Sequence, residues 1–173
     1  MVLFRKLTYN YKKYIAVEGN LMLKIERILI SDAEKIVETK KLAYTDEDIR
    51  FGEGKGDYLK YIGNVKFISW CMNRYHLYKI ILDGEIIGTF WLDHETDDRA
   101  NHFELQDFCI IPEYQNKGYG TKVMELMEKE HPNIKIWSLE TSSLSVRNQH
   151  LYEKMGYKKV EETGENICYE KIL

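Results

Sequence analysis

The stretch QNKGYG, residues 115–120, decides the fold of this chain because it lies between a predicted strand and a predicted helix. Before it, residues 105–111 read LQDFCII, an apolar run that is typical of a buried strand. After it, the apolar residues of the segment 120–129 recur at helical spacing, with charged residues on the opposite face. The six residues therefore form a strand-to-helix turn.

This turn is predicted to bind a diphosphate group. A helix N-terminus presents unpaired N–H groups and a partial positive charge, and a glycine allows a phosphate to approach them closely. The stretch lacks the Gly-Lys-Ser/Thr of a P-loop and the third glycine of a dinucleotide-binding fingerprint. The alternative interpretation is a tight turn in which the glycines only satisfy backbone geometry.

Composition excludes several classes of protein. The chain has 173 residues, the length of one domain, and a net charge of −3 with no basic run, so nucleic-acid binding is not expected. No apolar stretch approaches the roughly 20 residues of a membrane span. Cys71, Cys109 and Cys168 are few and widely spaced, which indicates a reducing, cytoplasmic location and no zinc site.

Residues 1–20 are interpreted as an N-terminal extension, and residues 21–173 as the folded domain. The extension carries basic residues but no apolar core long enough for a secretion signal. Two interpretations stay open. In the first, Met22 is the true start and the upstream residues are a mis-annotated reading frame. In the second, the extension is an added strand or a disordered tail.

Local signals divide the rest of the chain into strands and helices. Ser31 and Glu34 have the spacing of a helix capping box, and Asp83-Gly84 between two apolar runs is typical of a type I′ hairpin. The acidic loop 93–101 is interpreted as a solvated loop rather than a metal site. In chain order we predict a strand (21–29), a helix to Tyr44, a glycine-rich loop (51–56), a second helical stretch (58–72), a hairpin (77–82 and 85–92), a strand (103–111), a helix ended by Pro132, a strand (134–139), a helix (148–155) closed by Gly156, and two final strands (157–162 and 167–172).

Hairpins followed by a β-α-β-α-β run predict one mixed α/β domain with a mostly antiparallel sheet flanked by helices. The segment ELQDFCIIPEYQNKGYGTKVMELM, residues 104–127, resembles the coenzyme A segment of the GNAT superfamily of acetyl-CoA-dependent N-acetyltransferases. LYEKMGY, residues 151–157, resembles the second motif of that family. The resemblance covers residues 21–173 and is strongest between residues 103 and 157.

The resemblance implies that acetyl-CoA is the cosubstrate, with no metal. It implies that the main chain at the end of the central strand pairs with the pantetheine arm, and that the Ile110 N–H faces the thioester oxygen. Many relatives have an asparagine where this chain has Ser145, so Asn148 is the alternative contact to the pantetheine amides. The residues expected at the coenzyme are Cys109, Ile110, Ile111, Gln115, Asn116, Lys117, Gly118, Tyr119, Gly120, Thr121 and Asn148.

Acetyl transfer to an amine needs a base, because a lysine-like amine is charged at neutral pH, and an acid for the departing thiolate. By position in the second motif, Tyr152 is the expected acid. Glu104, on the central strand, is the candidate base, acting through water, or else a solvent-facing carboxylate. Strand alternation places Asp107 on the opposite face from Glu104. A nucleophilic Cys109 is the alternative to direct attack.

The predicted function is transfer of an acetyl group from acetyl-CoA to a primary amine of an unidentified small molecule or peptide. The acidic loop favours a cationic acceptor. Two alternatives stay open: a non-catalytic acyl-CoA-binding or sensing module on the same fold, and a nucleotide-binding α/β domain. Relatives are often dimers, which leaves a homodimer open.

Overall fold

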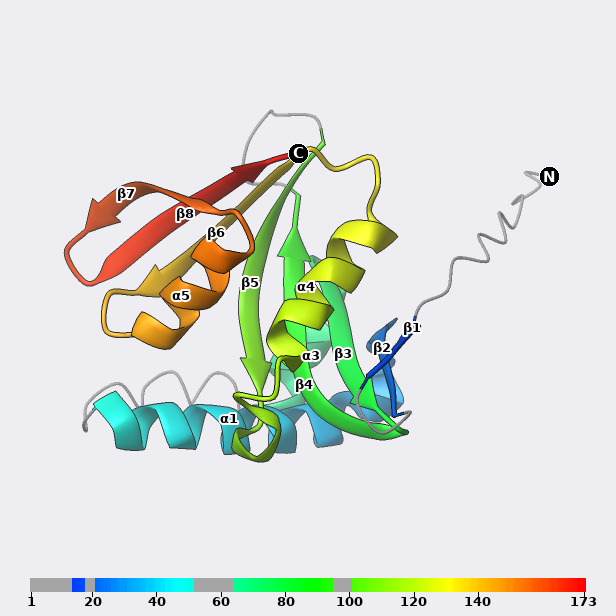
Figure 1. The fold of residues 1–173 in the computed structure, drawn as a ribbon. Helices are drawn as coiled ribbons and strands as arrows, with labels where there is room; N and C mark the ends of the chain where they lie inside the picture. The colour runs from blue at the N-terminus through cyan, green and yellow to red at the C-terminus, as the bar shows by residue number, and fades with distance from the viewer. Residues whose placement is uncertain (1–13, 18–20, 52–63, 95–100) are drawn as a thin grey trace.

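The fold is a single twisted sheet with helices on both faces (Figure 1). The computed structural model describes residues 14–17, 21–51, 64–94 and 101–173. The elements are β1 (Tyr14–Ala16), β2 (Met22–Arg27), the 3-10 turn η2 (Ile30–Asp32), α1 (Ala33–Phe51), α3 (Val65–Met72), β3 (His76–Leu82), β4 (Glu85–Asp93), β5 (His102–Ile110), the 3-10 turn η3 (Pro112–Tyr114), α4 (Tyr119–Glu130), β6 (Ile136–Ser142), α5 (Val146–Lys154), β7 (Lys158–Thr163) and β8 (Asn166–Ile172).

The sheet has eight strands in the order β1-β2-β3-β4-β5-β6-β8-β7. Every neighbouring pair is antiparallel except β5 and β6, which are parallel, so the predicted mixed and mostly antiparallel sheet is confirmed. The parallel pairing runs only from His102 opposite Ile136 to Leu105 opposite Leu139. Both strands continue past that point and diverge, which leaves a wedge between them (Figure 1).

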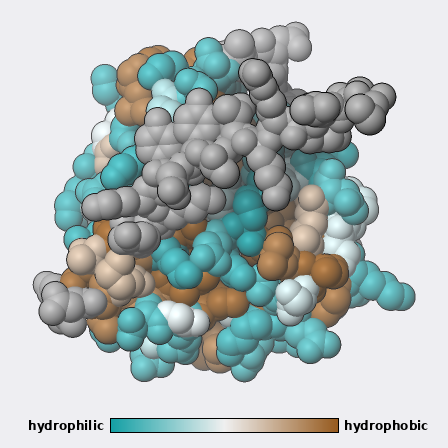
Figure 2. All heavy atoms as spheres, turned by 90° about the vertical axis from the view of Figure 1, so that its right-hand side faces the viewer, coloured by the Kyte–Doolittle hydropathy of each residue, from teal (hydrophilic) through white to brown (hydrophobic). Residues whose placement is uncertain are grey.

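Two apolar cores hold the helices on the sheet. The larger core lies between the sheet and α4 and α5, and includes Trp137 and Phe90, both fully buried. The smaller lies between the sheet and α1 and α3, around Ile36, Ile68 and Trp91. On the side of the molecule that carries β1 and β2, hydrophobic and hydrophilic residues are interspersed (Figure 2). Among the described residues no helix is both long and apolar enough to cross a bilayer.

Several predicted elements are confirmed. β3 and β4 form the hairpin, and Asp83 and Gly84 both have positive φ, 49° and 93°, as a type I′ turn requires. α4 ends at Glu130, before Pro132, and Gly156 after α5 has a φ of 88°. Tyr14–Ala16, within the predicted extension, pairs with β2.

The start and end of α1 were predicted wrongly. The Ser31–Glu34 capping box does not form, because residues 30–32 make a 3-10 turn in which the Leu29 N–H donates to Asp32 Oδ2 at 2.7 Å. The helix also continues past Tyr44 to Phe51, through polar residues that gave no apolar periodicity.

Some of the predicted elements lie partly outside the described residues. This applies to most of the glycine-rich loop, to the first part of the second helical stretch and to positions 95–100 of the acidic loop. The described part of the second stretch is α3, which begins at Val65. Asn64 precedes it, and its side-chain Oδ1 accepts a hydrogen bond from the Lys66 N–H at 2.8 Å.

Candidate active site

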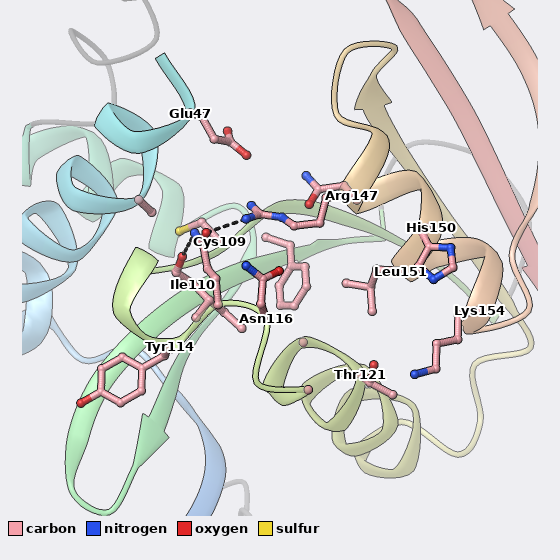
Figure 3. Close-up of a pocket in the computed structure, with 16 residues that line it drawn as sticks. Glu47, Cys109, Ile110, Tyr114, Asn116, Thr121, Arg147, His150, Leu151 and Lys154 are labelled. Carbon is pink, nitrogen blue, oxygen red and sulfur yellow. Dashed lines mark hydrogen bonds between the residues drawn. The ribbon is translucent and has the colours of Figure 1, made fainter. Parts of the chain in front are cut away.

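A cavity of about 360 Å³ lies beside the carboxyl end of β5, where the wedge opens (Figure 3). α1 contributes Ala43 and Glu47 to its wall, and β5 contributes its last three residues. The turn after η3, the first turn of α4 and one face of α5 complete the wall. The structure therefore brings the two sequence motifs, residues 104–127 and 151–157, to opposite sides of one cavity.

The end of β5 presents the Ile110 peptide to the wedge. The Ile111 N–H donates to the Ile87 carbonyl of β4 at 2.9 Å. Because successive N–H groups of a strand point to opposite sides, the Ile110 N–H points away from β4, toward the side from which β6 has diverged. Gly88 lies opposite, where a Cβ would stand 2.3 Å from the Cys109 carbonyl oxygen, so only glycine fits there.

The turn before α4 leaves main-chain N–H groups at the cavity. Asn116 and Gly118 have positive φ, 58° and 77°, and α4 begins at Tyr119. The Lys122 N–H donates to the Gly118 carbonyl at 3.3 Å, so the N–H groups of the three residues before it, from Tyr119 to Thr121, have no helical acceptor. Gly120 lies close to α5, since a Cβ there would stand 3.2 Å from Leu151 Cδ2.

Two residues of this turn have other contacts than those predicted. The Gln115 N–H donates to the Pro112 carbonyl at 3.1 Å, so it is already used within η3. The ammonium of Lys117 lies 5.6 Å from the centre of the Tyr114 ring, and Lys117 is not on the cavity wall.

The side chain of Gln115 links three elements, a role that the sequence did not indicate. Its Nε2 donates to the Ile110 carbonyl at 2.6 Å, and its Oε1 accepts from Arg147 Nη1 at 2.6 Å and from Arg50 Nη2 at 3.2 Å (Figure 3 shows the first two bonds). Burial and the nearby Arg147 charge lower the pKa of Arg50. No local motif signals these contacts, because Arg50, Gln115 and Arg147 are far apart in the sequence.

On α5, Asn148 and Leu151 line the cavity, whereas Ser145 is buried at the start of the helix. Tyr152 is only 5% exposed and packs against the rings of Tyr157 and Tyr169, with centroids 6.1 and 6.0 Å away. Burial, reinforced by the charge of Glu47, raises the pKa of Tyr152 far above that of a free phenol. The phenol is therefore neutral at all ordinary pH values. Tyr152 is not among the residues of the cavity wall.

The structure places Glu104 away from the cavity. It pairs with Asp93 of β4 and Ser138 of β6, and an extended strand puts it roughly 16 Å from Cys109. The carboxylate on the cavity wall is instead Glu47 of α1, which extends toward the cavity in Figure 3. Sequence reasoning missed Glu47 because it ended the helix at Tyr44, about two turns too early.

A bulge in β5 overturns the prediction that Asp107 and Glu104 lie on opposite faces. Thr89 pairs with Cys109 and Trp91 with Gln106, so Phe90 faces the two residues Asp107 and Phe108. Asp107, with a φ of 54°, directs its carboxylate to α1, where Lys40 and Tyr44 hydrogen-bond to it. Phe108 turns to the other face and packs against Phe90, with ring centroids 6.3 Å apart.

Comparison with known proteins identifies the family. The profile of the Acetyltransferase (GNAT) family matches residues 40–157, more than half of the chain. The chain belongs to this family. It carries the acetyltransferase domain of that family, and the fold predicted from the resemblance is confirmed.

Solved structures show the same fold at low sequence identity. The PaiA N-acetyltransferase of Thermoplasma acidophilum, in complex with coenzyme A, has a TM-score of 0.76 at 18% identity, over 87% of this chain and 99% of its own. A GNAT-family acetyltransferase of Streptococcus agalactiae has a TM-score of 0.71 at 16% identity, over 87% and 95%. Among curated proteins, uncharacterized YrkN of Bacillus subtilis is 29% identical over 86 residues, which are 49% of this chain and 45% of YrkN.

Cys109 of this GNAT protein is a poor nucleophile. Burial, with the nearby Asp107 carboxylate, raises the pKa of the Cys109 thiol well above its usual range. The group therefore stays a neutral thiol, which argues against a covalent acetyl-cysteine intermediate. Among the residues that the structure describes, no cluster of three or more His, Cys, Asp or Glu side chains is placed to hold a metal ion.

Proposed function

We propose that this protein transfers the acetyl group of acetyl-CoA to a primary amine by direct attack of the amine on the thioester. The observation that carries the proposal is a single cavity that joins an open strand edge, with the Ile110 N–H facing the wedge, to the N-terminus of α4. The strand edge suits an extended pantetheine arm, and the helix N-terminus suits a diphosphate.

The donor is held mainly by the main chain. The N–H groups of Gly120 and Thr121 receive the diphosphate, and the positive end of α4 favours its charge. The pantetheine arm lies along the open edge of β5 beside Ile110, and Asn148 on the facing wall adds a side-chain amide. Gly118 and Gly120 keep the turn thin enough for this approach.

The reaction then follows from the groups around the thioester. Glu47 accepts one proton from the charged amine and passes it to solvent, and the neutral nitrogen then attacks the carbonyl carbon. The Ile110 N–H donates to the oxygen as negative charge develops, as in an oxyanion hole. The C–N bond forms, the C–S bond breaks, and the thiolate leaves with the electron pair.

Tyr152 is proposed to stabilise the departing thiolate as a hydrogen-bond donor. Its raised pKa lies above the value of about 8.5 that is typical of a thiol, so complete proton transfer from the phenol to the thiolate is uphill. The second proton of the attacking nitrogen, lost as the amide forms, neutralises the thiolate instead, through Glu47 and water. In this proposal Tyr152 donates a hydrogen bond to the thiolate, instead of the proton that the resemblance implied.

An acceptor screen tests this function. Purified protein is incubated with acetyl-CoA and with polyamines, aminoglycosides, amino acids or peptides, and the release of free thiol is followed. We expect release with at least one amine class, and Tyr152→Phe should lower the turnover number while coenzyme A binding is unchanged. Coenzyme A binding without release for any amine would favour the sensing module. A larger thermal shift with ATP or NAD than with acetyl-CoA would favour a nucleotide-binding domain.

A further inference from the structure

We propose that Lys40, Tyr44 and Asp107 are positioning residues that hold the bulge of β5, and that this bulge is what turns the Ile110 N–H toward the wedge. The inference rests on the proposed function, because the Ile110 N–H matters only if a thioester oxygen is bound beside it. None of the three side chains is on the cavity wall, so they act through the backbone of β5.

The register of β4 and β5 shows what the bulge does. With the bulge, Ile111 lies opposite Ile87 and donates its N–H to the Ile87 carbonyl. Without the extra residue, every position after Gln106 would move by one, and Ile110 would lie opposite Ile87. Its N–H would then point into the sheet and bond to β4. The bulge therefore selects which peptide N–H faces the wedge.

The three side chains fix the one residue that creates the bulge. Lys40 and Tyr44 lie one helical turn apart on α1, and each bonds to a different carboxylate oxygen of Asp107. The Lys40 side chain is 0% exposed, and that of Asp107 is 8% exposed. The Lys40 ammonium also lies 4.1 Å from the centre of the Trp91 ring, on the strand opposite the bulge. Two strands and a helix thus converge on Asp107.

This arrangement costs stability, which favours a role other than packing. A buried ion pair is seldom more stable than well-packed apolar residues of similar volume, because both charges lose their hydration. Asp107 also has a φ of 54°, a conformation that non-glycine residues rarely adopt and that is concentrated at functional sites. An apolar residue in a regular strand would avoid both costs, but it would also remove the bulge.

The test compares substitutions at Asp107. Asp107→Asn keeps a side chain that accepts hydrogen bonds and tolerates positive φ, whereas Asp107→Leu removes the acceptor and favours a regular strand. We expect Asp107→Leu to lower kcat roughly 100-fold, the loss typical of one missing oxyanion donor, with KM for acetyl-CoA within about 3-fold of wild type. Asp107→Asn should keep most of the wild-type kcat, and Tyr44→Phe, which removes the hydrogen bond from the Tyr44 hydroxyl to Asp107, should lower kcat less than Asp107→Leu does.

A second measurement does not depend on activity. In protein labelled with ¹⁵N-isoleucine, the amide signal of Ile110 should shift on addition of coenzyme A in wild type and in Asp107→Asn. It should exchange slowly with solvent and no longer shift in Asp107→Leu, because the N–H is then bonded within the sheet. The control is Tyr78→Phe, which removes another largely buried tyrosine hydroxyl, bonded to His131 at 3.1 Å, and keeps the ring that stacks on Phe90 opposite the bulge.

The outcomes separate the two proposals. If wild type releases no thiol with any amine but the Ile110 signal behaves as described, the proposed function fails and the positioning role stands. If the Ile110 signal of folded Asp107→Leu or Tyr44→Phe still responds to coenzyme A as in wild type, the positioning role is overturned. A loss of activity in either variant that only matches its loss of folded protein, or that equals the loss in Tyr78→Phe, also overturns it.

Discussion

Gln115 Nε2 donates a hydrogen bond of 2.6 Å to the carbonyl oxygen of Ile110, and so ties the turn before α4 to the end of β5. The Ile110 carbonyl points to the same side of the strand as its N–H, away from β4. Gln115 therefore occupies the acceptor at the strand edge and leaves the N–H beside it for a ligand.

Replacing Gln115 by leucine is expected to weaken coenzyme A binding about 3- to 10-fold, because a hydrogen bond of this kind contributes roughly 0.5–1.5 kcal/mol. The change also removes the acceptor for Arg147 and Arg50. Titration calorimetry with coenzyme A measures the effect. Gln149→Leu is the matched control, since the Gln149 side chain donates to the carbonyls of Ser142 and Ser143, and it should bind coenzyme A as wild type does.

Gly118→Ala is expected to weaken coenzyme A binding for a conformational reason. Gly118 has a φ of 77° with open space around its Cα, so the added methyl group meets no neighbour but disfavours the left-handed conformation by roughly 1–2 kcal/mol. Gly164, in the turn between β7 and β8, has a φ of 58° and equally open space. Gly164→Ala should lower the melting temperature about as much as Gly118→Ala does, because both changes disfavour the same left-handed conformation. It should leave coenzyme A binding unchanged. Equal affinity in both variants would contradict a role for the turn.

Glu47→Gln is expected to lower kcat by roughly 100-fold or more at neutral pH, because the amide cannot accept the proton of the amine. Glu104→Gln, at a half-buried position away from the cavity, should change kcat less than about 2-fold, because its side chain does not line the cavity. Steady-state kinetics with the amine found in the screen measures both. The assignment of the base reverses if Glu104→Gln is the inactive variant.

The stability of the folded protein is expected to fall as the pH drops below about 6.5, partly because of His76. Burial, with the charges of Arg27 and His94, lowers the pKa of His76 below its ordinary value of 6.5. The unfolded chain therefore binds a proton first, and the stability present above pH 6.5 is lost as the pH falls through the folded-state pKa.

Urea unfolding at pH 7.5 and pH 5.5 measures this effect. His76→Gln should reduce the difference in unfolding free energy between the two pH values. His150→Gln, at an exposed position on α5, should leave the difference unchanged. An identical pH dependence in wild type and His76→Gln would show that His76 does not contribute.

Strong local patterns predicted most of the fold. The dipeptide Asp83-Gly84 predicted the β3–β4 turn almost without other information. The apolar run before QNKGYG correctly predicted a strand, β5. The extent of α1 could not be predicted, because its last two turns are mostly polar, and none of the side chains described there is fully buried. The capping box failed for a similar reason, since Asp32 competes with Ser31 for the same helix start.

Apart from Asn148, the cavity was predicted mainly where main-chain atoms form it. The turn before α4 depends on glycines, which are visible in a sequence. Glu47, Arg147 and Lys40 reach the end of β5 from other elements, and only tertiary packing reveals them. The bulge at Asp107 had no local signal either. An aspartate in an apolar strand indicates a special position, but alternation assigns it to the wrong face when an extra residue is inserted.

The short contact between β5 and β6 has a consequence for how the molecule is assembled. Strands β1 to β5 are joined to β6, β8 and β7 by the few residue pairs between 102–105 and 136–139. An extended cosubstrate bound along the edge of β5 would bridge this seam as an additional strand does. Binding of acetyl-CoA would then stabilise the association of the two parts of the sheet. Without it, the protein would unfold most readily between β5 and β6.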